Sequence, residues 1–425
     1  MFTMTFDENS NRAQNGVDMG RPIIARTIYI TFLLLVLVAC SNGGEGTSSP
    51  ANVQPTATPS RINIGSITVG YPGAIDGGTV TLQPATSFKQ GTMIAIAGDS
   101  GLIYSPSLQY APRSATLLEW YPDTNTSVTI VPALPGKLPR QPLVAANAQW
   151  VAVVYEPVSN DGPGNAGLVG SGWELRIINR MTNVTYTLAQ DTVSGSITET
   201  WNTFVTPDFS LYGDTLLWSD FVVQSGSIHH SLHLTNLATR ATSEILNIDA
   251  DGARHLIFLP NLSDNYAAWT ESLSYSTDPN HPDEHRTITV YDLRQGTILR
   301  KIDLGHNTHF GIAGPVIIGD LLAFGLNGLD SKGSTTSAVG YTSVKGSEAF
   351  IVTNEVGQPS LVTASADIIT WDIHQSGKPI AYNVLTHQSY LVTAKVDSII
   401  NTTVSNHRLF WQINGEPNIY YQDIH

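Results

Sequence analysis

The stretch "NLSDNYAAWTESLSY" (residues 261–275), followed by "RTITVYDLRQGTILRKID" (residues 286–303), contains the clearest structural unit of this 425-residue chain. It consists of a turn, an apolar segment with an aromatic residue, a long connection, and two strand-like segments around an Arg-Gln-Gly turn. The stretch therefore predicts three β-strands of one unit.

Similar apolar segments recur along the chain, and each contains one prominent aromatic residue. These residues are Tyr104, Tyr155, Trp218, Trp269, Phe324, Trp371 and Trp411. Their spacing averages about 51 residues, a period typical of repeated four-stranded units. Asp or Asn precedes most of the segments, as at Asp99 and Asp264, and favours tight turns there. Seven copies of one unit are therefore predicted.

The strand segments are apolar at consecutive positions, as in "TLLW", "YAAW" and "IITW". Such runs indicate that both faces of each sheet are covered. Sheets packed face to face around an axis provide this, so we expect an all-β propeller of seven four-stranded blades. The alternative is a tandem of β-sandwiches, which predicts alternating strands and a period of about 100 residues.

The last copy ends in "EPNIYYQDIH" (residues 416–425), which supplies only a third strand. A closed ring needs a fourth strand to cover this exposed edge. We expect an N-terminal segment, either "INIGSITVGY" (residues 62–71) or "GTVTLQP" (residues 78–84), to close the ring.

The unit "LSDNYAAWTES" with "ITVYDLRQGTILRKI" resembles the repeat of bacterial TolB-like and WD40-like β-propellers, over roughly residues 91–425. The chain lacks the Gly-His and Trp-Asp pair of WD40 repeats and the Asp-box of sialidases. The resemblance therefore implies the propeller fold and a role in an envelope assembly, but it specifies no activity.

Cys40 is the only cysteine, and it follows the apolar run "TIYITFLLLVLVA" (residues 27–39), with Arg21 and Arg26 before it. The run is shorter than the roughly 20 residues of a membrane-spanning helix and has the form of a signal peptide, predicted over residues 1–39. Residues 37–40 resemble the lipobox of bacterial lipoproteins, which implies a diacylglycerol on Cys40. A retained signal-anchor helix is the alternative, and either Met1 or Met19 fits the start of translation.

Residues 40–60 are rich in Gly, Ser, Thr and Pro, and predict a flexible tether ahead of a folded domain over residues 61–425. The expected location is therefore outside the cytoplasm, anchored to the cell membrane by the N-terminal lipid. The net charge of -14, without clusters of Lys or Arg, argues against nucleic acid as a partner.

A propeller blade places its second-to-third-strand connection and the connection to the next blade at one end of the ring. The segments expected there are long: residues 157–172, 191–202, 273–285 and 327–337. The connections expected at the other end are short. Because long loops on a rigid scaffold commonly carry binding sites, we expect function at the end with long loops.

Two groups of candidate site residues lie in these connections. His281, Asp283 and His285, with His306 and His309 on the next connection, offer ligands suited to zinc, manganese or iron; a solvated polar loop is the alternative. Trp173 and Trp201 are candidates for stacking on sugar rings or anchoring a protein, with burial between loops as the alternative.

The chain shows no Gly-x-Ser-x-Gly elbow and no Gly-rich phosphate loop, so it carries no recognisable hydrolase or nucleotide motif. We therefore expect a non-enzymatic binding or scaffold module for a protein partner or an envelope glycan, with no obligatory cofactor. Two alternatives stay open: a metal-dependent polysaccharide lyase or hydrolase that uses the His-rich loops, and a structural partner in an envelope assembly.

Overall fold

The computed structural model describes residues 62–64, 67–70, 78–82, 89–97, 101–107, 114–158, 172–192, 206–250, 255–274, 284–306, 311–329, 335–346, 348–353, 362–372, 379–392, 399–406, 408–413 and 416–424. Every regular element among them is a β-strand. These residues contain no helix of the length and apolar character needed to cross a membrane. Residues 58–425 form one compact unit.

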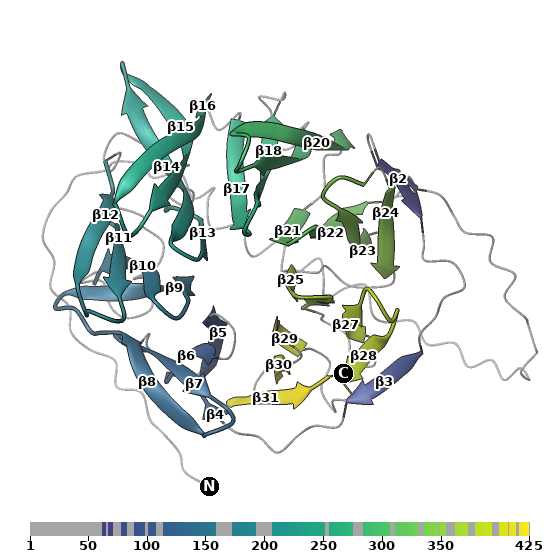
Figure 1. Ribbon diagram of the computed structural model, residues 1–425, viewed down its shortest axis with the longest axis horizontal. Helices are drawn as coiled ribbons and strands as arrows, with labels where there is room; N and C mark the ends of the chain where they lie inside the picture. The colour runs from purple at the N-terminus through teal and green to yellow at the C-terminus, as the bar shows by residue number, and fades with distance from the viewer. Residues whose placement is uncertain are drawn as a thin grey trace, which may run out of the picture. The chain divides into compact units, whose positions relative to one another are not determined.

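The strands of this unit form a ring of seven four-stranded blades (Figure 1). Blade 1 contains β5 (Thr92–Ala97), β6 (Gly101–Ser105), β7 (Leu117–Tyr121) and β8 (Thr126–Val131); blade 2 contains β9 (Lys137–Ala146), β10 (Trp150–Pro157), β11 (Glu174–Asn179) and β12 (Thr185–Gln190); blade 3 contains β13 (Phe209–Tyr212), β14 (Thr215–Gln224), β15 (Ser227–Asn236) and β16 (Ala241–Asp249); blade 4 contains β17 (His255–Leu262), β18 (Tyr266–Ser274), β19 (Glu284–Asp292) and β20 (Thr297–His306).

The remaining blades continue in the same way around the ring. Blade 5 contains β21 (Gly311–Ile318), β22 (Leu321–Leu329), β23 (Thr335–Ser343) and β24 (Glu348–Thr353); blade 6 contains β25 (Val362–Ser365), β26 (Ile368–Trp371), β27 (Pro379–Asn383) and β28 (Ser389–Val392); blade 7 contains β29 (Ile399–Ser405), β30 (Arg408–Ile413) and β31 (Asn418–Asp423) with an N-terminal strand. The predicted seven-bladed propeller is confirmed, and the tandem-sandwich alternative is wrong.

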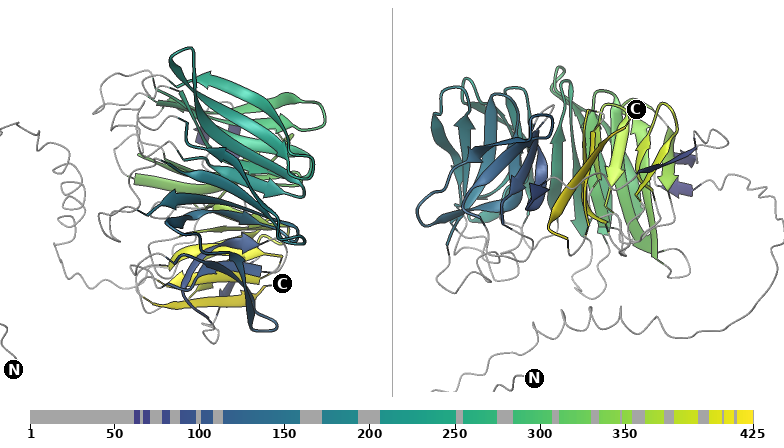
Figure 2. Two further views of the ribbon diagram at one scale, coloured as in Figure 1. Left: turned by 90° about the vertical axis from the view of Figure 1, so that its left-hand side faces the viewer. Right: turned by 90° about the horizontal axis from the view of Figure 1, so that it is seen from below.

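The second strand of each blade is buried on both faces, which explains its unbroken apolar sequence. Blade 4 shows the arrangement clearly. On one face, Trp269 packs with Leu217 and Leu232 of blade 3. On the other face, Ala268 packs with Ile317 and other apolar residues of blade 5. Because each blade covers its neighbours, the core is a series of interblade layers rather than one central cluster. Figure 2 shows the blades side by side from two further directions.

The ring is closed by β4 (Lys89–Gln90), which pairs antiparallel with β31 as the fourth strand of blade 7 (Figure 1). The expectation of an N-terminal closing strand is therefore confirmed. Both segments proposed for it are wrong, because they lie on other blades. In the first, β1 (Ile62–Ile64) and β2 (Ile67–Gly70) extend blade 5 through a parallel pairing of β2 with β24. In the second, β3 (Thr79–Leu82) pairs parallel with β28 of blade 6.

The innermost strands of blades 1, 2, 4, 5 and 7 each change register opposite the aromatic region of the second strand. Three of these irregular stretches contain a residue with positive φ: Leu259 (51°), Gly314 (95°) and Asn401 (52°). A β-bulge releases backbone N–H groups from the ladder, and these groups need other partners. The preceding blade provides them: Asp208 Oδ2 accepts from the Leu259 N–H at 3.3 Å, and Gln412 Oε1 accepts from the Met93 N–H at 3.3 Å.

The connections at the two ends of the ring differ in length. Residues 158–173, 191–208, 275–283 and 330–334 connect strands at one end, which we call the loop-rich end. At the other end, connections such as residues 213–214, 263–265 and 319–320 are tight turns. The strands of all seven blades run between these two ends, so their residues near the loop-rich end are held by the scaffold.

Candidate functional site

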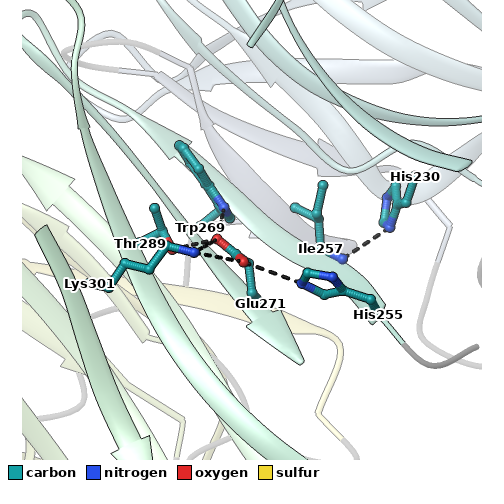
Figure 3. A network of polar contacts seen from close by, with 7 residues as sticks. All are labelled: His230, His255, Ile257, Trp269, Glu271, Thr289 and Lys301. Atoms are coloured by element: carbon teal, nitrogen blue, oxygen red, sulfur yellow. Dashed lines mark hydrogen bonds and ion pairs between the residues drawn. The ribbon is translucent and has the colours of Figure 1, made fainter. Parts of the chain in front are cut away.

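Two groups of polar side chains, most of them buried, flank blade 3 on its two faces. The first group surrounds Glu271 on β18, on the face of blade 4 that packs against blade 3 (Figure 3). Its Oε1 accepts hydrogen bonds from Trp269 Nε1 at 3.0 Å, Thr289 Oγ1 at 2.5 Å and Lys301 Nζ at 3.2 Å. Its Oε2 is 3.1 Å from Lys301 Nζ and 3.3 Å from His255 Nε2. Both carboxylate oxygens are therefore fully engaged.

The electrostatics of this first group favour a permanent charge on Glu271. Burial by itself would raise the pKa of Glu271, but the hydrogen bonds from His255 and Thr289 and the charge of Lys301 lower it to about 2. Glu271 is thus a carboxylate at neutral pH, with its donors already in place. Such a fully partnered buried charge stabilises the blade and has no capacity left for a ligand.

His230 on β15 connects blade 3 to blade 4 beside this group (Figure 3). Its Nδ1 accepts a hydrogen bond from the backbone N–H of Ile257 at 3.0 Å, and its ring stacks on Phe221 at 4.1 Å. Burial, with a smaller effect of the charge of His255, lowers the pKa of His230 to about 3. His230 is therefore neutral and acts as an acceptor, a structural role.

The second group lies on the opposite face of blade 3, between blades 2 and 3, and we call it the interblade polar site: Trp173, Asp191, Asp220 and His233. Trp218 and Asp220 share one face of β14 because successive residues of a strand alternate, and Trp218 packs with Trp173 of blade 2. His233 stacks on Trp218 with ring centroids 4.5 Å apart. These contacts place Asp220 and His233 in the interface with blade 2.

Blade 2 contributes the other half of the interblade polar site, where one of its connections ends and another begins. Trp173 directly precedes β11, and Asp191 directly follows β12. The Asp191 N–H donates to the Trp173 carbonyl at 3.0 Å, and the Asp191 carboxylate accepts from the Gly172 N–H at 2.6 Å. Trp173 and Asp191 are thereby fixed to each other at the loop-rich end.

Three side-chain atoms of the interblade polar site have no hydrogen-bond partner within the described part of the chain: Trp173 Nε1, Asp220 Oδ1 and His233 Nε2. Trp173 is 1% exposed and Asp220 is 6% exposed, so bulk water does not solvate them in this state. A buried polar group without a partner costs about 1–3 kcal/mol. The site therefore has unused hydrogen-bonding capacity, in contrast to the group around Glu271.

Asp220 also differs from Glu271 in its protonation. Burial raises the pKa of Asp220 to about 7; a hydrogen bond from the Phe221 N–H opposes the rise, and the nearby carboxylate of Asp191 adds to it. Burial lowers the pKa of His233. At neutral pH the site therefore holds a carboxyl group that can donate or accept a hydrogen bond, beside a neutral imidazole.

The structure locates only some of the residues expected to form a site. Trp173 is packed inside the interface, so it offers an indole N–H rather than an open ring face. His285 on β19 lies 2.6 Å from Asp303 through its Nε2, and it pairs in register with His306 on β20, whose backbone alone is described. Cys40, Trp201, His281, Asp283 and His309 lie outside the described residues.

Two findings differ from what the sequence led us to expect: one concerns Asp220 and the other concerns metal ligands. Asp220 was missed, although the segment "GDTLLWSD" contained its signal: an acidic residue two positions after the strand aromatic, beyond the middle of the strand. In addition, the residues described by the structure include no group of three or more His, Cys, Asp or Glu side chains arranged to hold a metal ion.

Similarity to known proteins is confined to the fold. No family model matches the chain, and no curated protein matches it. Among solved structures it is similar to a prolyl endopeptidase, with 12% identity and a TM-score of 0.48, over 79% of this chain and 47% of the longer endopeptidase. It is also similar to the β-propeller domain of the Trilobed protease from Pyrococcus furiosus (8% identity, TM-score 0.43, 68% and 82% coverage) and to the polysaccharide lyase Uly1 (13%, 0.45, 80% and 93%).

The strand order of the chain itself defines the seven-bladed β-propeller, and these similarities carry no conclusion about its activity. The chain spans less than half of the endopeptidase, so that enzyme's catalytic function is not transferred with the fold.

Proposed function

We propose that this protein is a binding or scaffold module that holds a protein partner or a cell-envelope glycan at its loop-rich end. The observation that carries the proposal is the difference between the two ends of the ring: residues 158–173 and 191–208 connect strands at one end, whereas tight turns such as residues 213–214 do so at the other. Loops on a rigid scaffold are the usual location of binding residues. In the interblade polar site, Trp173 directly precedes a strand and Asp191 directly follows one at the same end.

The proposed setting is outside the cytoplasm, with the propeller anchored to the cell membrane through a lipid on Cys40. The support is the sequence around Cys40 and the tether that follows it. Mass spectrometry of the membrane-bound protein should detect diacylglycerol on Cys40, and Cys40→Ser should release the protein from the membrane fraction. An unmodified Cys40 in a membrane-bound protein would contradict the anchor and leave the binding proposal intact.

The binding proposal is tested by comparing variants at the two ends of the ring. The first variant replaces residues 159–171, within one of these long connections, with a short Gly-Ser connection. Its control carries Met181→Ser and Leu385→Ser, which change side chains 77% and 74% exposed at the turn end. Each protein is used to capture cross-linked partners and to probe purified envelope glycans. Loss of binding in the loop variant alone supports the proposal, and loss in the turn-end variant alone contradicts it.

A metal-dependent polysaccharide lyase or hydrolase is the second candidate function. It is favoured by the register that places His285 opposite His306, with Asp303 2.6 Å from His285. Imidazole and carboxylate ligands suit zinc, manganese or iron. Elemental analysis of the protein purified without chelator, beside the variant His285→Ala, tests it. Near-stoichiometric metal that is lost in the variant supports this candidate, and a metal-free wild-type protein opposes it.

A further inference from the structure

The interblade polar site presents a specific combination of unused groups. The indole Nε1–H of Trp173 can only donate a hydrogen bond. Oδ1 of Asp220 accepts when the carboxyl is ionised and donates or accepts when it is protonated. The neutral ring of His233 can use Nε2 in either way, depending on its tautomer. None of the three atoms has a partner among the described residues.

We propose that the interblade polar site is a binding subsite for a hydroxyl-bearing ligand, a neutral sugar ring or polyol whose hydroxyl groups bond to Trp173 Nε1, Asp220 Oδ1 and His233 Nε2. This inference rests on the proposed binding function, since it assigns a ligand class to the same end of the ring. It is independent of the identity of any protein partner.

The donor and acceptor types select hydroxyl groups over other ligand chemistries. A hydroxyl donates one hydrogen bond and accepts others, so it satisfies both the Trp173 indole and the Asp220 carboxyl. An ammonium, guanidinium or metal cation has no acceptor for the Trp173 N–H. An anionic ligand would be repelled by Asp191, which already raises the pKa of Asp220 by its charge, and by a chain of net charge -14.

The surroundings of the site match the apolar part of such a ligand. Trp173 and Trp218 belong to one hydrophobic cluster in the interface between blades 2 and 3. An apolar and aromatic lining with a few placed polar groups is the usual composition of a small-molecule site. Asp220 and His233 are diagonal neighbours on adjacent strands, because Asp220 pairs with Ser231 in the ladder of β14 and β15.

Unpartnered atoms elsewhere in the propeller do not form such a group. Trp371 and Trp411 also lack a partner for the indole N–H. Trp371 packs between blades 5 and 6 and Trp411 between blades 6 and 7, whereas the other unpartnered side-chain atoms among the described residues belong to blades 2 and 3. A single indole N–H can be left without a hydrogen-bond partner when a large aromatic side chain is packed tightly between two blades. The gathering of three polar side chains from two blades is what points to a ligand.

The experiment is a titration followed through the tryptophan indole N–H signals of the nitrogen-15-labelled protein. The probes are glucose, galactose, N-acetylglucosamine and glycerol, added separately. Trp173→Phe assigns the Trp173 signal, because only that signal disappears. We expect a saturable shift of the Trp173 signal with at least one probe, and a loss of that shift in Asp220→Leu, which removes the polar group and keeps an apolar side chain of similar size.

Trp173→Phe removes one hydrogen-bond donor and should weaken the binding of the same probe about tenfold, measured by calorimetry. Trp371→Phe is the matched control, since it makes the same chemical change at another unpartnered indole and should leave affinity unchanged. Asp220→Asn keeps the shape of the side chain and an acceptor oxygen but removes the acidic group. It therefore shows whether the site stays folded without the carboxyl.

Three outcomes decide the inference. It is overturned if no probe moves the Trp173 signal, which would mean that only water occupies the site. It is also overturned if other indole signals move and that of Trp173 does not; binding would then lie elsewhere, and the proposed function would stand. If the Trp173 signal moves while partner and glycan binding is lost in the turn-end variant alone, the subsite is supported and the wider proposal about the loop-rich end fails.

Discussion

Asp372 of blade 6 accepts a hydrogen bond from the backbone N–H of Thr402 in blade 7, with 2.5 Å between Oδ1 and N. Thr402 Oγ1 donates to the same oxygen at 3.0 Å. The Thr402 N–H lies at the β-bulge of the innermost strand of blade 7, where the regular ladder is interrupted. Asp372 therefore substitutes for a missing ladder partner, and similar contacts join other blades around the ring.

Replacement of Asp372 by Ala should lower the free energy of unfolding by about 2–3 kcal/mol, because it leaves the buried Thr402 N–H without an acceptor. Urea denaturation measures the change. The control is Asp264→Ala, an exposed acidic residue in a turn of blade 4, which should change stability by less than about 0.5 kcal/mol. Equal effects of the two substitutions would show that the contact between blades 6 and 7 contributes nothing specific.

Leu82→Ala should destabilise the protein by about 2–4 kcal/mol, the usual cost of truncating a buried leucine. Leu82 lies on β3 and is fully buried in a cluster with Ile380 and Tyr390 of blade 6. The neighbouring exposed residue, changed as Thr81→Ala, provides the control and should have little effect. If Leu82→Ala is as mild as Thr81→Ala in thermal unfolding, β3 does not pack on blade 6.

Asp220 should make the protein less stable as the pH rises. Its pKa is raised to about 7 in the folded state from an ordinary value of 3.8, so the folded state holds the proton more tightly. The resulting stabilisation is complete below pH 3.8 and is lost as the pH rises to about 7, for a total of about 4 kcal/mol.

The measurement is the difference in unfolding free energy between the wild-type protein and Asp220→Asn, as a function of pH. The comparison isolates Asp220 from His230, whose lowered pKa acts in the opposite direction by reducing stability as the pH falls below 6.5. A difference that does not vary between pH 4 and pH 7 would contradict the assignment of a raised pKa to Asp220.

Glu271→Gln and Asp220→Asn should have opposite consequences at pH 8. Glu271→Gln removes a charge that Lys301 and His255 contact, and should destabilise the protein by about 2–4 kcal/mol. Asp220→Asn removes a buried charge that lacks a cationic partner among the described residues, and should be neutral or stabilising. Thermal unfolding at pH 8 compares them directly. The distinction between the two sites fails if Asp220→Asn is the more damaging change.

The repeated architecture was predictable because it depends on local sequence properties. Runs such as "TLLW" around Trp218 show that both faces of a strand are covered, and the spacing of the aromatic residues shows how often the strand recurs. The identity of the closing strand was not predictable, since Lys89–Gln90 is short and polar and owes its place to its neighbour in the chain, β5. Residues 62–71 have a stronger strand pattern, yet they pair on blade 5.

The sequence indicated Trp173, but not the blade 3 residues that complete the interblade polar site. Long connections at one end of the ring indicated where to look, and Trp173 lies at the start of a blade 2 strand there. The stacking or anchoring role expected for Trp173 required an exposed indole ring. The contacts between blades 2 and 3 decide that exposure, and the sequence does not show them. Asp220 and His233 became visible as a pair only in the ladder of β14 and β15, because the sequence does not show which strand faces which blade.

The measurement that tests the account of the site most directly is the titration of individual carboxyl groups by carbon-13 nuclear magnetic resonance, with Asp220→Asn and Glu271→Gln used for assignment. We predict that the Asp220 carboxyl titrates with a midpoint near pH 7 and that Glu271 stays ionised down to about pH 2. Ordinary midpoints near pH 4 for both groups would contradict the account, because blade 3 would then have no unpartnered buried acid on the side facing blade 2.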